Sequence, residues 1–113
     1  MELSVTTTMQ IILCNCPDEQ IAEQIARQLL SMQQAACINI LPGVRSIYRW
    51  QGQIETSVEV AMLIKAPVAQ FDAISQTICR LHPYTVPEII AVPVTQGFLP
   101  YLHWVNEECL PNE

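Results

Sequence analysis

Two prolines four residues apart, Pro83 and Pro87, constrain the fold of this chain more than any other local feature. They lie in the segment His82–Ile89, which also carries an imidazole, a phenol and a carboxylate within seven residues. Each proline fixes its own φ angle and keeps the preceding residue out of the α region. We therefore expect a stiff connector that enters a strand at Glu88. Rigid polar side chains on such a connector are typical of a binding site.

Strand-like and helical apolar spacings alternate along the chain, and their order predicts the fold class. Every-second or continuous apolar positions indicate strands, and stripes at three- to four-residue spacing indicate amphipathic helices. Pro42-Gly43 predicts a bulge in the second strand, and Gln51-Gly52 predicts a tight reversal after it. Pro93 predicts that the last strand frays or lies at an edge. In order, the predicted elements are strand 9–14, helix 17–34, strands 36–50 and 54–65, helix 71–81, strand 88–94 and a short helix from Pro100 with Phe98, Tyr101, Leu102 and Val105 facing inward.

This order predicts an α+β fold, a ferredoxin-like split βαβ sandwich (βαββαβ) followed by a C-terminal helix. We expect a single domain over residues 9–113, preceded by a flexible N-terminus of residues 1–8. The hairpin formed by the second and third strands, residues 36–65, is longer than so small a sheet needs. Its tip should project, and a projecting strand pair invites pairing with a neighbouring chain.

Composition excludes several classes of protein. Net charge is −6 with five Lys and Arg together, which argues against nucleic-acid binding because phosphate contacts need clustered cations. Half of the residues are hydrophobic, so we expect part of the surface to be covered by another subunit. No apolar run reaches the length of a membrane span. Residues 1–8 lack the basic residues of a signal peptide, and the odd number of five cysteines favours reduced thiols and a cytoplasmic location.

Cys14 and His82 are the candidate metal ligands. If the first strand continues to Pro17, Cys14 shares one of its faces with Cys16, two residues further on. Thiolate and imidazole together suit copper or zinc. The alternative is that the cysteines are small core residues. The spacing leaves open whether His82 meets Cys14 within one subunit or across a subunit boundary.

The remaining chemistry-bearing residues favour structural roles. We expect Cys37 and Cys79 to pack in the core, Cys109 to be half exposed, and His103 to be solvent-exposed. Tyr48 and Trp50 are expected to be buried against a neighbouring subunit. Glu59 and Lys65 either form ion pairs, which we favour, or line an inter-subunit cleft with Tyr84 and Glu88. With three glycines and no C-x-x-C, the chain lacks a phosphate-cradling loop and a thioredoxin-type motif, and we expect no enzymatic activity.

Three separate blocks resemble the CutA family, the divalent-cation tolerance proteins. The first is Leu13-Cys14-Asn15-Cys16-Pro17-Asp18-Glu19. The second runs from Ala35 to Gly43 and continues as Ser46-Ile47-Tyr48-Arg49-Trp50-Gln51-Gly52. The third is His82-Pro83-Tyr84-Thr85-Val86-Pro87-Glu88-Ile89. Their order and spacing extend the resemblance over nearly the whole chain, from about Ile11 to Leu110.

The resemblance implies a tight homotrimer whose extended hairpins pair between subunits. It also implies a non-enzymatic role in tolerance of copper or another divalent cation, with signalling as an additional role. The family's metal site uses a cysteine that falls on Cys14 and a pair of histidines before Pro-Tyr. Here that pair reads Leu81-His82, so only His82 is kept. Two alternatives stay open: a copper chaperone that uses Cys14 and Cys16, and an uncharacterised small-ligand site between subunits.

Overall fold

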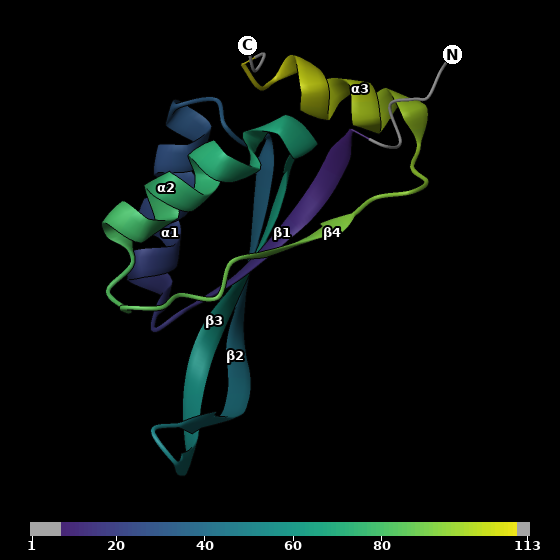
Figure 1. The fold of residues 1–113 in the computed structure, drawn as a ribbon. Coiled ribbons are helices and arrows are strands. Elements are labelled where there is room, and N and C mark those ends of the chain that lie inside the picture. The colour runs from purple at the N-terminus through teal and green to yellow at the C-terminus, as the bar shows by residue number, and fades with distance from the viewer. Residues whose placement is uncertain (1–7, 111–113) are drawn as a thin grey trace.

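The computed structural model describes residues 8–110, which form a four-stranded sheet and three α-helices (Figure 1). Of the expected flexible N-terminus, residues 1–8, all but Thr8 lie outside the described residues. In the described part of the chain, no helix has both the length and the apolar character needed to cross a membrane. The elements are β1 (Met9–Cys16), α1 (Glu19–Ser31), β2 (Cys37–Trp50), β3 (Gln53–Pro67), the short 3₁₀-helix η2 (Val68–Gln70), α2 (Phe71–Leu81), β4 (Ile90–Pro93) and α3 (Leu99–Glu107).

The sheet has the strand order β2-β3-β1-β4, and every neighbouring pair is antiparallel. This confirms the predicted mixture of helices with a strand sheet. Helices α1 and α2 lie together on one face of it (Figure 1). Because side chains alternate along a strand, Ile12, Cys14 and Cys16 of β1 point toward these helices. Met9 points to the opposite face, where Leu102 of α3 packs against it.

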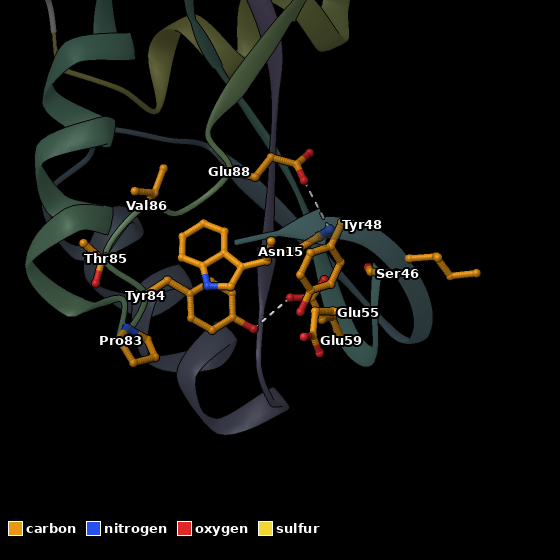
Figure 2. A pocket seen from close by; sticks show the side chains of 12 residues that line it. Asn15, Ser46, Tyr48, Glu55, Glu59, Pro83, Tyr84, Thr85, Val86 and Glu88 are labelled. Atoms are coloured by element: carbon orange, nitrogen blue, oxygen red, sulfur yellow. Dashed lines mark hydrogen bonds between the residues drawn. The ribbon is translucent and has the colours of Figure 1, made fainter. Parts of the chain in front are cut away.

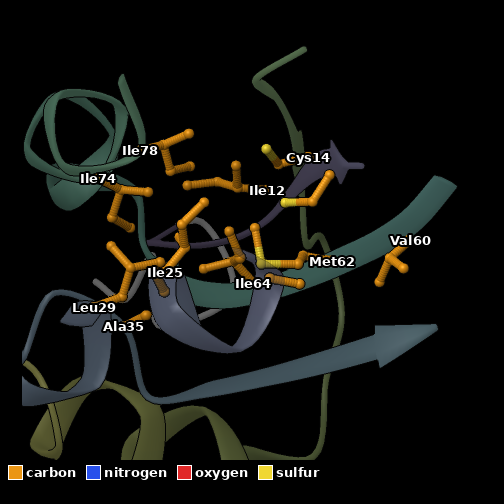
Figure 3. Close-up of a cluster of buried hydrophobic side chains, with 13 residues drawn as sticks. Ile12, Cys14, Ile25, Leu29, Ala35, Val60, Met62, Ile64, Ile74 and Ile78 are labelled. Carbon is orange, nitrogen blue, oxygen red and sulfur yellow. The ribbon is translucent and has the colours of Figure 1, made fainter. Parts of the chain in front are cut away.

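The main core lies between the sheet and the two helices (Figure 3). Ile12 of β1 and Ile64 of β3 are paired in register and fully buried. Ile25 of α1 and Ile74 of α2 meet them from the helical layer and are also fully buried. Each such side chain contributes roughly 1.5–3 kcal/mol through removal of apolar area from water. This core fixes the end of β1 and the end of α2, where the candidate ligands lie.

Helix α1 begins at Glu19, two residues after the predicted start at Pro17. Asp18 is its N-cap, with an extended backbone, and its Oδ1 accepts a hydrogen bond from the backbone N–H of Ile21 at 2.8 Å. Only Pro17 and Asp18 separate the end of β1 from the start of α1. The helix ends at Ser31, three residues before the predicted end near Gln34, because Gln33 takes a left-handed conformation with φ of 56°.

The hairpin of β2 and β3 projects from the body and gives the molecule its long axis of 50 Å (Figure 1). The register shifts between Leu41 and Val44, which confirms the predicted bulge. Gly43 supplies a φ of +77° at this point. Gln51 and Gly52 both have positive φ at the tip, as a tight two-residue turn between twisted strands requires. The predicted reversal is therefore also confirmed.

The sheet face opposite α1 and α2 is apolar and partly open. Ile11 and Leu13 of β1 and Leu63 of β3 are partly exposed there, next to Ile90 and Val92 of the edge strand β4. Helix α3 covers only the end of this face near Met9. An apolar sheet face of this kind is costly in water, and a further protein layer would cover it.

Strand β4 and helix α3 also differ from the prediction. Strand β4 spans Ile90–Pro93 rather than 88–94, and Glu88, just before it, is held by the Asn15 side chain. On α3, only Leu102 and Val105 are buried, and the prediction for Phe98 and Tyr101 was wrong. Phe98 precedes the helix as its N-cap and is 75% exposed.

Two of the cysteine predictions were also wrong. Cys79 is exposed rather than in the core, since it follows Ile78 on α2 and is rotated out of the buried stripe. Cys109 is buried rather than half exposed. The segment after α3 folds back onto the end of α1, where Leu110 donates its N–H to the Gln33 carbonyl at 2.9 Å. Cys37 is only partly buried and belongs to neither core cluster, whereas His103 is exposed, as expected.

Candidate functional site

The end of β1 carries the two candidate cysteines. Cys14 pairs with Met62 and Cys16 with Val60 in the antiparallel ladder between β1 and β3. Both cysteines point toward the helical layer, and neither has any exposed surface. The structure therefore places both sulfur atoms on one face of one strand, as the i, i+2 spacing predicted.

His82 is the residue at which α2 ends and the proline connector begins. Its backbone is extended, with φ of −81° and ψ of 135°, as the residue before Pro83 should be. The ring is 6% exposed. Its Nδ1 accepts the backbone N–H of Tyr84 at 3.2 Å, and its Nε2 lies 2.7 Å from the carbonyl oxygen of Asn15. These partners assign a neutral ring that carries its proton on Nε2.

Cys14, Cys16 and His82 meet within one subunit. One ligand atom from each, the two Sγ atoms and a ring nitrogen, lie within 4.8 Å of one another. The sequence had left open whether Cys14 and His82 share a subunit, and the structure answers this because the connector crosses the end of β1. Leu81 packs against the core and offers no ligand.

The two thiols affect each other's pKa. Interaction with Cys16, together with burial, raises the pKa of Cys14, whose thiol lies 3.8 Å from the Asn15 carbonyl oxygen. Interaction with Cys14 lowers the pKa of Cys16, against the opposing effect of burial. Cys16 is therefore the sulfur that loses its proton first, and a thiolate is the form that binds metals.

A groove of about 850 Å³ opens beside this cluster (Figure 2). One wall is the connector and the other is the projecting hairpin, and Asn15 lies between them. The Tyr84 hydroxyl crosses the groove and donates a hydrogen bond to Glu59 Oε2 at 2.8 Å. Asn15 Nδ2 donates to Glu88 Oε1 at 3.3 Å. The lining residues are Asn15, Ser46, Ile47, Tyr48, Trp50, Glu55, Glu59, Pro83, Tyr84, Thr85, Val86 and Glu88.

The preferred ion-pair interpretation of Glu59 and Lys65 was wrong. Within residues 8–110, Glu59 bonds to Tyr84 and forms no ion pair, and Lys65 reaches the side-chain oxygen of Asn39. The alternative holds in part, because Glu59, Tyr84 and Glu88 do line a groove, and the groove forms within one chain. Burial, followed by the contact with Glu59, raises the pKa of Tyr84 to about 12.

One groove residue was missed in the sequence, and two others keep an untested prediction. Tyr48 and Trp50 line the groove and are about half exposed in the single chain, and their burial against a neighbouring subunit stays a prediction. Glu55 received no assignment, although the hairpin register places it opposite Tyr48. Counting back from the Gln51-Gly52 turn would have found this pair.

Comparison with protein families matches residues 10–108 to the family described as CutA1 divalent ion tolerance protein. Protein CutA of Mus musculus is 46% identical over 92 residues, which cover 81% of this chain and 52% of that protein. The chain thus spans about half the length of the mouse relative. The divalent-cation tolerance protein CutA of Thermus thermophilus is 42% identical over 98 residues, covering 87% of this chain and 95% of the relative.

Solved structures show the same similarity. The divalent cation tolerance protein of Thermus thermophilus superimposes with a TM-score of 0.88 at 40% identity, covering 89% of this chain and 98% of that one. CutA1 from Oryza sativa superimposes with a TM-score of 0.90 at 33% identity, covering 95% and 98%.

Proposed function

Because the chain belongs to the CutA1 divalent ion tolerance family, we propose that it is a non-enzymatic protein of metal tolerance. In this proposal a thiophilic cation binds at Cys14, Cys16 and His82, and copper is the preferred candidate. The observation that carries the proposal is the meeting of two sulfur atoms and an imidazole nitrogen within 4.8 Å. The names of the relatives, which refer to divalent-cation tolerance, support it.

The donor set fits copper and zinc. Two thiolates and one imidazole are soft to borderline ligands, and they disfavour magnesium and calcium, which prefer oxygen. Metal–sulfur and metal–nitrogen bonds are about 2.3 and 2.0 Å long, so donors that lie within 4.8 Å of one another are close enough to share one ion. The Nε2–H bond of His82 to the Asn15 carbonyl is the kind of outer contact that orients a ligating histidine.

We infer that the sheet is ferredoxin-like and that three copies assemble through their projecting hairpins. The strand order β2-β3-β1-β4 supports the topology. Ile54 and Val58 on the projecting hairpin are 70% and 67% exposed, and a two-stranded arm gains little stability alone. Pairing with sister hairpins would bury these side chains.

A copper chaperone is the second candidate, and the burial of the cysteines weighs against it. Transfer of a metal to a partner requires ligands that the partner can reach, whereas Cys14 and Cys16 have no exposed surface. All five cysteines are unpaired, which supports our proposal of a reducing, cytoplasmic location.

Anaerobic titration with Cu(I) and with Zn²⁺ tests the metal site. We expect tight binding by the reduced protein and its loss in the Cys14→Ser, Cys16→Ser double variant. His82→Gln should weaken binding by about 10- to 100-fold. Cys79→Ser, which removes an exposed thiol outside the cluster, is the matched control and should bind as the wild type does. Equal binding by the double variant and by Cys79→Ser would rule out the cluster.

Light scattering after size exclusion tests the assembly separately. We expect a mass three times that of the chain at micromolar concentration, and a shift toward smaller species in the Ile54→Glu, Val58→Glu variant. A wild-type monomer would refute the trimer and leave the metal proposal intact.

A further inference from the structure

We infer that the groove beside the cluster binds an organic ammonium cation, a positively charged amine on an apolar body. This goes beyond the proposed metal role and uses different residues. Three carboxylates, Glu55, Glu59 and Glu88, line the groove, and none of its lining residues is Lys, Arg or His. The groove therefore offers negative charge that this chain does not neutralise with a cation of its own.

Glu59 is the central acidic group. Only 7% of it is exposed, and Oε2 is held by the Tyr84 hydroxyl at 2.8 Å. Within the described residues, Oε1 has no hydrogen-bond partner and no cation pairs with this side chain. Burial of a carboxylate without a positive partner is unfavourable, and a bound cation would relieve it.

Aromatic side chains supply the second half of the site. Tyr84 is fixed at both ends, since its hydroxyl bonds Glu59 and its ring contacts His82 with centroids 4.6 Å apart. Tyr48 and Trp50 of β2 also line the groove and keep about half of their surface exposed. Aromatic faces attract ammonium groups, and the attraction adds to that of the carboxylates.

The size of the groove favours an organic ligand over a bare ion. Its volume of about 850 Å³ is in the range of pockets for small molecules, and Pro83 and Val86 add apolar wall. The strand register places Tyr48 opposite Glu55, on the side of the hairpin away from Ile54 and Arg49. Contacts made through the Ile54 side of the hairpin would therefore leave Tyr48 and Glu55 uncovered.

Tyramine and its neutral isostere tyrosol provide the test, with the assembled protein in EDTA. The chain has two tryptophans, so Trp104→Phe on α3 leaves Trp50 as the single reporter of groove occupancy. We expect saturable quenching by tyramine, with tyrosol weaker by about tenfold or more. Equal affinity for the two compounds, or no saturable signal from tyramine, would overturn the inference.

Charge variants locate the site. Glu59→Gln keeps an acceptor for Tyr84 and should reduce tyramine affinity by about tenfold, while Glu23→Gln on the exposed side of α1 should leave it unchanged. If Glu59→Gln lowers the melting temperature, Glu55→Gln at an exposed position makes the same test. Equal affinities in wild type and Glu55→Gln, or displacement of tyramine by Mg²⁺ at matched ionic strength, would refute an organic-cation site. Cu(I) binding by these variants, which keep all three candidate ligands, separates this result from the metal proposal.

Discussion

The His82 ring donates a hydrogen bond from Nε2 to the backbone carbonyl of Asn15, across 2.7 Å and 67 positions of sequence. This bond ties the proline connector to the end of β1. The Asn15 side chain, in turn, holds Glu88 at the far end of the connector. Cys14 and Cys16 flank Asn15 on the other face of the strand, so one residue joins the thiol cluster to the groove.

Replacement of His82 by alanine should destabilise the metal-free protein. It leaves the Asn15 carbonyl and the Tyr84 N–H without their partners and opens a buried cavity. We expect a loss of about 1–3 kcal/mol in the free energy of unfolding, measured by urea denaturation at fixed protein concentration. His103→Ala on exposed α3 should stay within about 0.5 kcal/mol of wild type. Similar losses in both variants would show that the Asn15 contact is not stabilising.

The core between the sheet and the helices sets the scale of stability. Ile25 of α1 is fully buried, and Ile25→Ala should cost about 2–5 kcal/mol because it removes packing and leaves a cavity. Leu30, on the same helix and 43% exposed, is the matched control, and Leu30→Ala should cost less than about 1 kcal/mol. Thermal and urea unfolding measure both. An equally large loss at Leu30 would mean that another subunit covers α1.

The order of elements could be predicted because local signals agree with the tertiary fold. The bulge at Pro42-Gly43, the turn at Gln51-Gly52 and the approximate start of α1 near Pro17 depend on local backbone preferences. The metal candidates Cys14 and His82 also came from short motifs, and the structure brings them together. That meeting depends on where the connector crosses the sheet, which no local pattern specifies.

The groove was less predictable because it depends on pairing between distant segments. Glu59 looked like an ordinary strand charge, and only the approach of Tyr84 from the connector gives it a partner. Cys79 and Cys109 were misassigned for a related reason. The prediction for Cys79 relied on its apolar neighbour Ile78, but the rotation between successive helical residues turns Cys79 outward. Cys109 is buried because the segment after α3 returns to Gln33.

Tyr84 should make stability depend on pH in the alkaline range. Its pKa is raised from 10.0 to about 12, first by burial and then by Glu59. Between these two values the unfolded chain loses the phenolic proton while the folded chain keeps it, so folding stability falls as pH rises. We expect Tyr84→Phe to flatten this fall relative to wild type, measured by urea unfolding between pH 9 and 12. Parallel pH profiles would contradict the raised pKa of Tyr84.

The reactivity of the five thiols tests whether the cysteines of the proposed metal site are buried. Cys79 is exposed, whereas Cys14, Cys16 and Cys109 are buried. Burial, with the charge of Glu108, also raises the pKa of Cys109 to about 11 and suppresses its reactive thiolate. We expect iodoacetamide to label Cys79 fastest in the native protein, as mapped by mass spectrometry.

Three variants assign the labelling phases. Cys79→Ser should remove the fast phase, and Cys109→Ser should leave it intact. In the wild type, Cys16 has the lowered pKa of the coupled pair, so its thiolate is intrinsically available and only burial protects it. His82→Ala opens the cavity beside it and should therefore speed its labelling specifically. Labelling of Cys16 as fast as that of Cys79 in the wild type would show that the cluster is open to solvent. Such a result would favour the copper-chaperone alternative, which the burial of the cysteines now disfavours.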